Sequence, residues 1–230
     1  GRVIFNGTDP EIAEALAMGC WSGREAFGVE QGWHLTTDGR VDFGGERFGV
    51  LELAMPGQHN RLNALAAIAA ARHVGVVPAL GIEALGRFIN AKRRMEKVAE
   101  VNGVTIFDDF AHHPTAIATT LDGLRQRIGS AKLIAIVEPR SNSMKLGAHR
   151  DGLPQSVVQA DSVYWYAPPN LGWDLAGTVA TSTVPTQVCD SLEAIIAGVK
   201  AEATPGTQIV VMSNGGFGGL HGKLAAALEG

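Results

Sequence analysis

The residues best suited to chemistry lie between Val104 and Pro114, where the sequence reads VTIFDDFAHHP. An apolar, β-branched run ends in two carboxylates, Asp108 and Asp109, and an aromatic residue, two histidines and a proline follow at once. A helical pattern comes next, so we expect a strand that turns directly into a helix. In an open parallel sheet, ligands bind at the carboxyl ends of the strands. Charged, hydrogen-bonding and aromatic groups in this turn therefore predict a ligand site.

The two histidines of this turn are adjacent, so on an extended segment their side chains would point to opposite faces. They cannot chelate one metal ion as an i, i+4 pair does, and we predict no metal site in the chain. Pro114 suits the first position of a helix, which makes His113 the expected N-cap and leaves the aspartates free. A carboxylate at this edge suits a pair of ribose hydroxyls, and His112 is expected to bond to nucleotide or to the turn backbone.

A second polar group, His59, Asn60 and Asn63, opens an alanine-rich helix. One alternative is that Asn60 only caps that helix and has no role in ligand binding. Asn63 lies three residues further on and shares its face of the helix. Two amides there can both donate to and accept from the edge of an adenine ring, so Asn63 favours a nucleotide contact over a simple cap.

Two further strand ends carry polar side chains. In EPRSNS, residues 138–143, Arg140 stands beside Ser141 and Asn142 and could clamp a carboxylate; the alternative is a tight structural loop around the proline. In MSNGGFGG, residues 212–219, a strand ends in a glycine-rich turn. Its glycines leave room for close approach of the backbone to a ligand.

The remaining sequence supplies the elements that must position these groups. From Met95 onward strands alternate with helices, which is typical of a parallel, doubly wound sheet. Right-handed crossovers then bring the strand ends to one edge. We predict an α/β protein with two domains, 1–91 and 92–230, the second a Rossmann-like, mostly parallel sheet. The expected helices are 9–18, 61–74, 81–88, 115–127, 153–159, 191–200 and 218–228, and the expected strands are 3–6, 26–30, 33–37, 40–43, 48–54, 96–101, 104–108, 133–137, 162–166 and 208–212.

Composition excludes several classes of function. The 230 residues carry a net charge of −4 without a long basic cluster, which argues against sequence-independent nucleic-acid binding. Cys20 and Cys189 lie far apart and form no C-x-x-C, so a disulfide scaffold and a cysteine zinc site are excluded and a cytoplasmic location is expected. No apolar run approaches the ~20 residues of a membrane span, and no membrane partner is expected.

Three parts of the sequence together resemble the Mur ligases, the ATP-dependent amide-forming enzymes of bacterial cell-wall synthesis. VTIFDDFAHHP is similar to the signature of their C-terminal domain, and PGQHNRLNALAAIAAA, residues 56–71, is similar to a segment of their central ATPase domain. EPRSNSMKLGAHRD and MSNGGFGGLHGKL resemble the members that take a murein tripeptide. The resemblance is in register over nearly the whole chain, and it implies part of the central domain followed by a complete C-terminal domain.

The resemblance also implies roles for single residues. Arg94 would be the arginine directed at the γ-phosphate, whereas the alternative for Arg93 and Arg94 is solvated surface charge. One set of side chains would bind ATP, at the adenine or the ribose, and a second set would bind the incoming substrate. The ATP set is His59, Asn60, Asn63, Asp109 and His112, and the substrate set is Arg140, Ser141, Asn142, Ser213 and Asn214.

The chain lacks the phosphate-binding loop of the family, G-x-x-x-x-G-K-[ST]. We therefore expect that loop and the Mg²⁺ ligands upstream of residue 1, and no activity from this chain alone. The resemblance implies a full enzyme that activates the lactyl carboxylate of UDP-N-acetylmuramate with ATP. The amine of L-Ala-γ-D-Glu-meso-diaminopimelate would attack the acyl phosphate. The alternatives are the ligase that adds L-alanine to the same nucleotide, and a Rossmann-like nucleotide-binding module without ligase chemistry.

Overall fold

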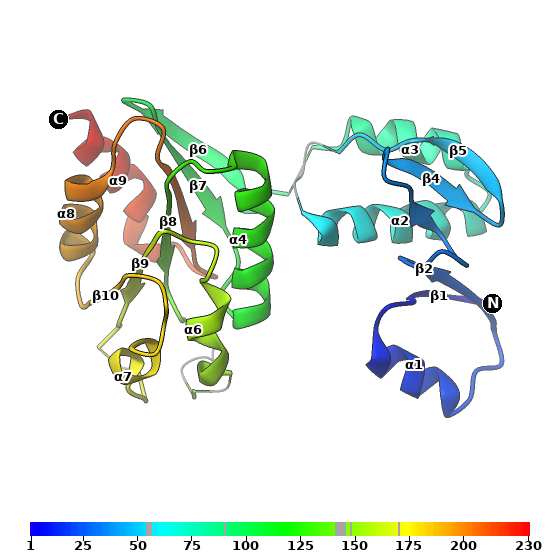
Figure 1. Ribbon diagram of the computed structural model, residues 1–230, viewed down its shortest axis with the longest axis horizontal. Helices are drawn as coiled ribbons and strands as arrows, with labels where there is room; N and C mark the ends of the chain where they lie inside the picture. The colour runs from blue at the N-terminus through cyan, green and yellow to red at the C-terminus, as the bar shows by residue number, and fades with distance from the viewer. Residues whose placement is uncertain (54–56, 90, 141–145, 148, 170) are drawn as a thin grey trace. The chain divides into compact units, whose positions relative to one another are not determined.

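The chain forms two compact units, Gly1–Ile89 and Asn90–Gly230 (Figure 1). The structure is a computed structural model that describes residues 1–53, 57–89, 91–140, 146–147, 149–169 and 171–230. Within these ranges, no helix is both long and apolar enough to cross a membrane.

The first unit contains a parallel strand pair, a small antiparallel sheet and three helices. β1 pairs with β2 in parallel, and β3, β4 and β5 form the antiparallel sheet in chain order. The elements are β1 (Arg2–Asn6), α1 (Pro10–Ala17), β2 (Gly23–Phe27), β3 (His34–Leu35), β4 (Arg40–Phe43), β5 (Glu46–Val50), α2 (Gln58–His73) and α3 (Pro78–Gly86).

The core of this unit forms around Trp33, whose ring is fully buried and stacks on Phe43 at 4.5 Å between centroids. The Trp33 Nε1–H donates to Oε1 of the buried Glu25 at 2.6 Å. Burial alone would raise the pKa of the Glu25 carboxyl, but hydrogen bonds from Trp33 and Arg2 hold that pKa below its usual range. Helix α2 packs on this core through one apolar stripe, consisting of Ala64, Leu65, Ile68 and Ala69.

The second unit is built on a six-stranded sheet in the order β10-β9-β8-β11-β7-β6. All neighbouring strands are parallel except β6 and β7, which form the expected hairpin. Asn102 and Gly103 turn that hairpin with φ of 49° and 77°, as a type I′ turn requires. Its elements are β6 (Glu96–Val101), β7 (Val104–Asp109), α4 (Pro114–Ile128), β8 (Leu133–Val137), α6 (Leu153–Ser156), β9 (Ser162–Tyr166), α7 (Leu175–Val179), β10 (Thr186–Cys189), α8 (Leu192–Glu202), β11 (Gln208–Met212) and α9 (Leu220–Glu229).

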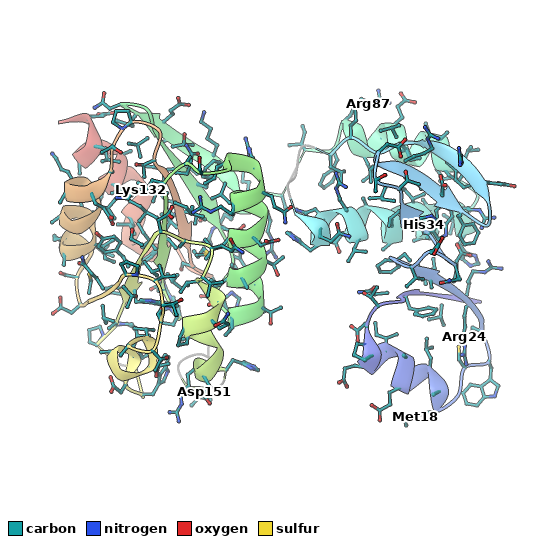
Figure 2. All side chains as sticks on the ribbon, viewed as in Figure 1. Met18, Arg24, His34, Arg87, Lys132 and Asp151 are labelled. Carbon is teal, nitrogen blue, oxygen red and sulfur yellow. The ribbon has the colours of Figure 1, made fainter. Side chains whose placement is uncertain are left out.

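Helices cover both faces of this sheet, so the predicted doubly wound α/β fold is confirmed. Helices α4, α6 and α7 contribute to one buried apolar cluster, and α8 and α9 contribute to another on the opposite face (Figure 1). Side chains of the helices and the sheet fill the space between the layers (Figure 2). The central strands are apolar throughout because both of their faces are covered.

Strand β11 lies between β7 and β8, and this position creates a topological switch point. The chain leaves β7 and β8 for helices on one face, α4 and α6, but leaves β11 for α9 on the other. Met212 at the end of β11 pairs with Asp109 on one side and with Val137 on the other. The ends of all three strands therefore lie side by side, at the place where open α/β sheets bind ligands.

Several element boundaries differ from the sequence-based expectation. Helix α2 begins at Gln58 rather than residue 61, and β2 lies three residues earlier than predicted. Strand β10 and helix α7 were not predicted. Both are short, with four and five residues, so hydrophobic periodicity gives almost no signal for them.

Candidate functional site

Polar side chains from three strands meet at this switch point. The backbone N–H of Ser213 donates to the carbonyl oxygen of Asp109 at 3.1 Å. The N–H of Glu138 donates to the carbonyl oxygen of Met212 at 2.9 Å, so the chain after β8 stays in register with β11. The Ser213 hydroxyl donates to the Glu138 carboxylate, and both residues are buried. The ends of β7, β8 and β11 thus form one connected polar edge.

Asp109 holds the turn after β7 together. Its side chain is buried and both carboxylate oxygens accept hydrogen bonds. Oδ2 accepts from the N–H of Met95 at 2.9 Å, and Oδ1 accepts from the N–H of Ala111 at 2.8 Å and from the hydroxyl of Thr120 at 3.1 Å. This structural role was not visible in the sequence. Its contact with an ATP ribose stays a prediction.

Arg93 binds the same edge, so the interpretation of this arginine as solvated surface charge is wrong. Its Nε–H donates to Oδ2 of Asp108 at 3.0 Å. Its Nη2 donates to the carbonyl oxygens of Ser213 at 2.6 Å and Gly215 at 2.8 Å. On the other side of the Asp108 carboxylate, Nε2 of His221 lies 3.2 Å from Oδ1.

Sequence reasoning missed Arg93 and His221 as members of the site. Arg93 stands in a run of basic residues, which usually marks a solvated surface. Its side-chain partners lie up to 122 residues away. No local pattern identifies such contacts, although the order of the strands, once known, brings their partners to one edge.

Arg94 and His112 gather around the half-buried ring of Phe110. The guanidinium carbon of Arg94 lies 5.5 Å from the centroid of that ring, within the range of a cation–π contact. Nδ1 of His112 lies 2.8 Å from the carbonyl oxygen of Phe110. The structure therefore brings together two of the residues assigned to ATP, and the exposed Arg94 side chain is accessible to a ligand.

His113 is the N-cap of α4, as the sequence predicted. Its Nδ1 accepts from the N–H of Ala116 at 3.5 Å, and Pro114 occupies the first helical position. Burial lowers the pKa of the His113 imidazole, and the nearby His112 and His149 lower it further.

The lowered pKa of His113 predicts a loss of stability in mild acid. The folded state favours the neutral ring, so this contribution is complete above the unfolded pKa of about 6.5 and is lost as the pH falls through the lower folded pKa. Protonation also removes the cap acceptor and places a positive charge at a helix N-terminus. We expect His113→Asn, a cap that does not titrate, to reduce the loss of stability between pH 8 and pH 5 in urea unfolding. An unchanged pH dependence would show that the cap does not titrate.

Arg140 lies against the glycine-rich turn that follows β11. Its Nη1 lies 4.0 Å from Oε1 of Glu138, and about half of its side chain (49%) is exposed. A Cβ atom added to Gly215 would stand 2.4 Å from Nη1, so a larger residue there would displace the guanidinium. The N–H of Gly215 donates to the hydroxyl of Ser213 at 2.9 Å, which fixes the turn beside the arginine. Asn214 is half-buried in this turn.

Two of the predicted substrate residues, Ser141 and Asn142, lie outside the described residues. What the structure shows of this group is therefore Arg140 together with Ser213 and Asn214. Ser213 is buried, and its N–H and hydroxyl already bind Asp109 and Glu138. The exposed part of the Arg140 guanidinium and the half-buried Asn214 are the groups that suit a carboxylate.

In the first unit, the group of polar residues at the start of α2 does not cap the helix. The N-cap is Gly57, which has φ of 98° and makes no side-chain cap bond. The interpretation of Asn60 as a cap is therefore wrong. His59 and Asn60 are half-buried in the first turn and Asn63 is exposed. An adenine contact of these residues stays a prediction.

No group of three or more His, Cys, Asp or Glu side chains suited to holding a metal ion occurs among the residues that the structure describes. The candidate site is thus an edge of hydrogen-bonding groups, with two exposed arginines, Arg94 and Arg140. It can hold anions and hydrogen-bonding ligands.

Residues 93–215, more than half of the chain, match the family model described as "Mur ligase, glutamate ligase domain". The chain belongs to the Mur ligase family. This family assignment agrees with the resemblance found in the sequence, and it covers the described parts of the switch-point edge from Arg93 to Gly215.

The chain is similar in sequence to two named ligases, and in sequence and fold to a solved ligase structure. The chain is 46% identical, over 99% of its length and 51% of the relative, to the UDP-N-acetylmuramate–L-alanyl-gamma-D-glutamyl-meso-2,6-diaminoheptandioate ligase of Escherichia coli (strain K12). It is 31% identical, over 93% of its length and 47% of the relative, to the UDP-N-acetylmuramate–L-alanine ligase of Mycobacterium sp. (strain JLS). The crystal structure of a murein peptide ligase from Psychrobacter arcticus 273-4 matches with a TM-score of 0.76 and 39% identity, over 100% of this chain and 51% of that one. The chain thus spans about half the length of these relatives.

Proposed function

We propose that this chain is part of an ATP-dependent ligase that joins L-Ala-γ-D-Glu-meso-diaminopimelate to UDP-N-acetylmuramate through an acyl phosphate. One observation carries the proposal: an exposed arginine, Arg140, lies beside the Ser213–Gly215 turn at the switch point of a Mur ligase sheet. The greater identity to the tripeptide ligase of E. coli than to the L-alanine ligase supports this choice of acceptor.

The chemistry of the acceptor fits this surface. The tripeptide carries several carboxylates, whereas L-alanine carries one. An arginine fork binds a carboxylate through two parallel hydrogen bonds and stays charged at every relevant pH. We assign Arg140 and Asn214 to the tripeptide, together with Ser141 and Asn142. The buried Ser213, predicted from the sequence as a direct contact, would support the turn through its bonds to Glu138 and Asp109.

The proposed ATP contacts are assigned within each unit separately. Asn60 and Asn63, and more loosely His59, would bind the adenine. In the second unit, Arg94 would bind phosphate, Asp109 would lie near the ribose, and His112 would bind nucleotide.

The phosphate loop and the Mg²⁺ ligands are expected in the half of the relatives that this chain does not span. When bound, Mg²⁺ would neutralise phosphate charge. This chain would contribute orientation, and it would exclude water from the acyl phosphate. Because the reaction consumes ATP and a nucleotide sugar, we propose the cytoplasm as its compartment.

An acceptor assay on the full-length protein, meaning this chain joined to the half of the ligase that it does not span, tests the proposal. With UDP-N-acetylmuramate, ATP and Mg²⁺, we expect kcat/KM for the tripeptide to exceed that for L-alanine by at least about 100-fold. Phosphate release and the mass of the product measure the reaction. The 230-residue chain alone should show no turnover, because its sequence lacks the phosphate-binding loop.

The other outcomes identify the alternatives. A preference for L-alanine would assign the chain to the L-alanine ligase. Nucleotide binding without product from either acceptor would indicate a binding module without ligase chemistry. Magnesium-dependent turnover by the 230-residue chain alone would contradict the expectation that the loop lies upstream.

A further inference from the structure

The glycine-rich turn between β11 and α9, residues 213–219, is held at its start by Arg93. The carbonyl groups of Ser213 and Gly215 both accept from the same nitrogen, Nη2, and the third acceptor of Arg93 is Asp108 on β7. One guanidinium thus joins the end of β7 to two points of the turn. Without it, these two carbonyl groups would lose the charged donor that orients them.

The same carboxylate also reaches the residues after the turn. His221, in the first turn of α9, places Nε2 3.2 Å from Oδ1 of Asp108, while Arg93 binds Oδ2. Between these points the Phe217 side chain is fully buried against the ring of Tyr166. The turn is therefore held at its start by Arg93 and within it by Phe217, while His221 lies close to the same carboxylate without a hydrogen bond to it.

The backbone of Arg93 is fixed as firmly as its side chain. Its N–H donates to Oε2 of Glu96 at 2.8 Å, and its carbonyl oxygen accepts from the N–H of Phe110 at 2.9 Å. Arg93 adopts a φ of 61°, a left-handed conformation that costs free energy for a residue other than glycine. An arginine that served only as a solvated surface charge would need none of these contacts.

We propose that Arg93 is the positioning residue of the acceptor site: it holds the Ser213–Gly215 turn in the conformation that presents the half-buried Asn214, together with Arg140, to the tripeptide. This inference rests on the proposed function for the identity of the ligand. Arg93 acts through the turn, because the donors on its Nε and Nη2 already bind three acceptors of the protein. Its effect should therefore fall on the acceptor substrate and spare ATP.

The chain contains a matched control, Arg125 in α4. Its guanidinium also binds one carboxylate, that of Asp161 at 2.8 Å, and several backbone carbonyls, including those of Gln159 and Gly129. Asp161 in turn accepts from the N–H of Leu133, so this network lies at the amino ends of the strands, away from the switch-point edge. An arginine that only stabilises the fold should behave like Arg125.

The test compares Arg93→Lys, Arg93→Met and Arg125→Lys in the full-length protein. Lysine keeps the charge of Arg93 but cannot reach three acceptors at once. We expect Arg93→Lys to raise KM for the tripeptide by about tenfold or more, with KM for ATP within about twofold of wild type. Hydrogen exchange of the peptide covering residues 213–219, measured by mass spectrometry, should become at least about tenfold faster. Arg93→Met should enlarge both effects, and Arg125→Lys should lower the melting temperature without causing either.

Three outcomes would overturn the inference: unchanged exchange of the turn in Arg93→Lys, equal effects of Arg93→Lys and Arg125→Lys on the turn, or a rise in KM for ATP that equals the rise for the tripeptide. If the wild-type protein does not use the tripeptide at all, the proposed function is wrong. The exchange measurement then decides alone whether Arg93 positions the turn.

Discussion

Asp109→Ala is expected to lower the free energy of unfolding of the second unit by about 3–5 kcal/mol. The substitution leaves three donors without an acceptor: the buried N–H of Ala111, the buried hydroxyl of Thr120 and the partly buried N–H of Met95. Each unsatisfied donor costs about 1–3 kcal/mol, and local relaxation recovers part of the total. Urea unfolding of the 230-residue chain at pH 7 measures the effect, and Asp109→Asn should be intermediate because it keeps one acceptor oxygen.

Asn63→Ala is the comparison that separates stability from nucleotide binding. Asn63 is exposed on α2, so its loss should change the free energy of unfolding by less than about 0.5 kcal/mol. In the full-length protein Asn63→Ala should raise KM for ATP if the Asn63 amide binds adenine.

An Asp109→Ala chain that is as stable as wild type would contradict the structural role of the Asp109 carboxylate and would favour its direct use at the ribose.

The second unit could be predicted in outline because its strands and helices are regular. The apolar run of β8, LIAIV, is buried on both faces, and periodic helices separate it from similar runs. This alternation fixes a parallel sheet, and the handedness of the crossovers then brings Asp109, Glu138 and Ser213 to one edge. The hairpin at Asn102 was equally predictable, because its turn needs two residues with positive φ.

The details of the site could not be predicted because they depend on contacts over long sequence separations. Whether Asp109 is a free carboxylate or a buried acceptor depends on the N–H of Met95 and the hydroxyl of Thr120, and neither has a sequence signal. Arg93 looked like surface charge because the acceptors of its side chain lie 15 to 122 residues away in the chain. The start of α2 was misplaced because Gln58, His59 and Asn60 are polar, whereas backbone geometry at Gly57 begins the helix.

Arg140→Ala should reduce kcat/KM for the tripeptide by about 30- to 1000-fold in the full-length protein. Removing a charged hydrogen-bonding partner costs about 2–4 kcal/mol, and each 1.4 kcal/mol corresponds to a factor of ten in rate. KM for ATP should stay nearly unchanged, and Arg140→Lys should recover only part of the loss because an ammonium group lacks the planar fork. Arg127→Ala is the control, since Arg127 is an exposed arginine in the last turn of α4, at the end of that helix away from the site. If Arg140→Ala lowers stability and leaves tripeptide kinetics untouched, this arginine only orders its loop, and the acceptor must be bound elsewhere.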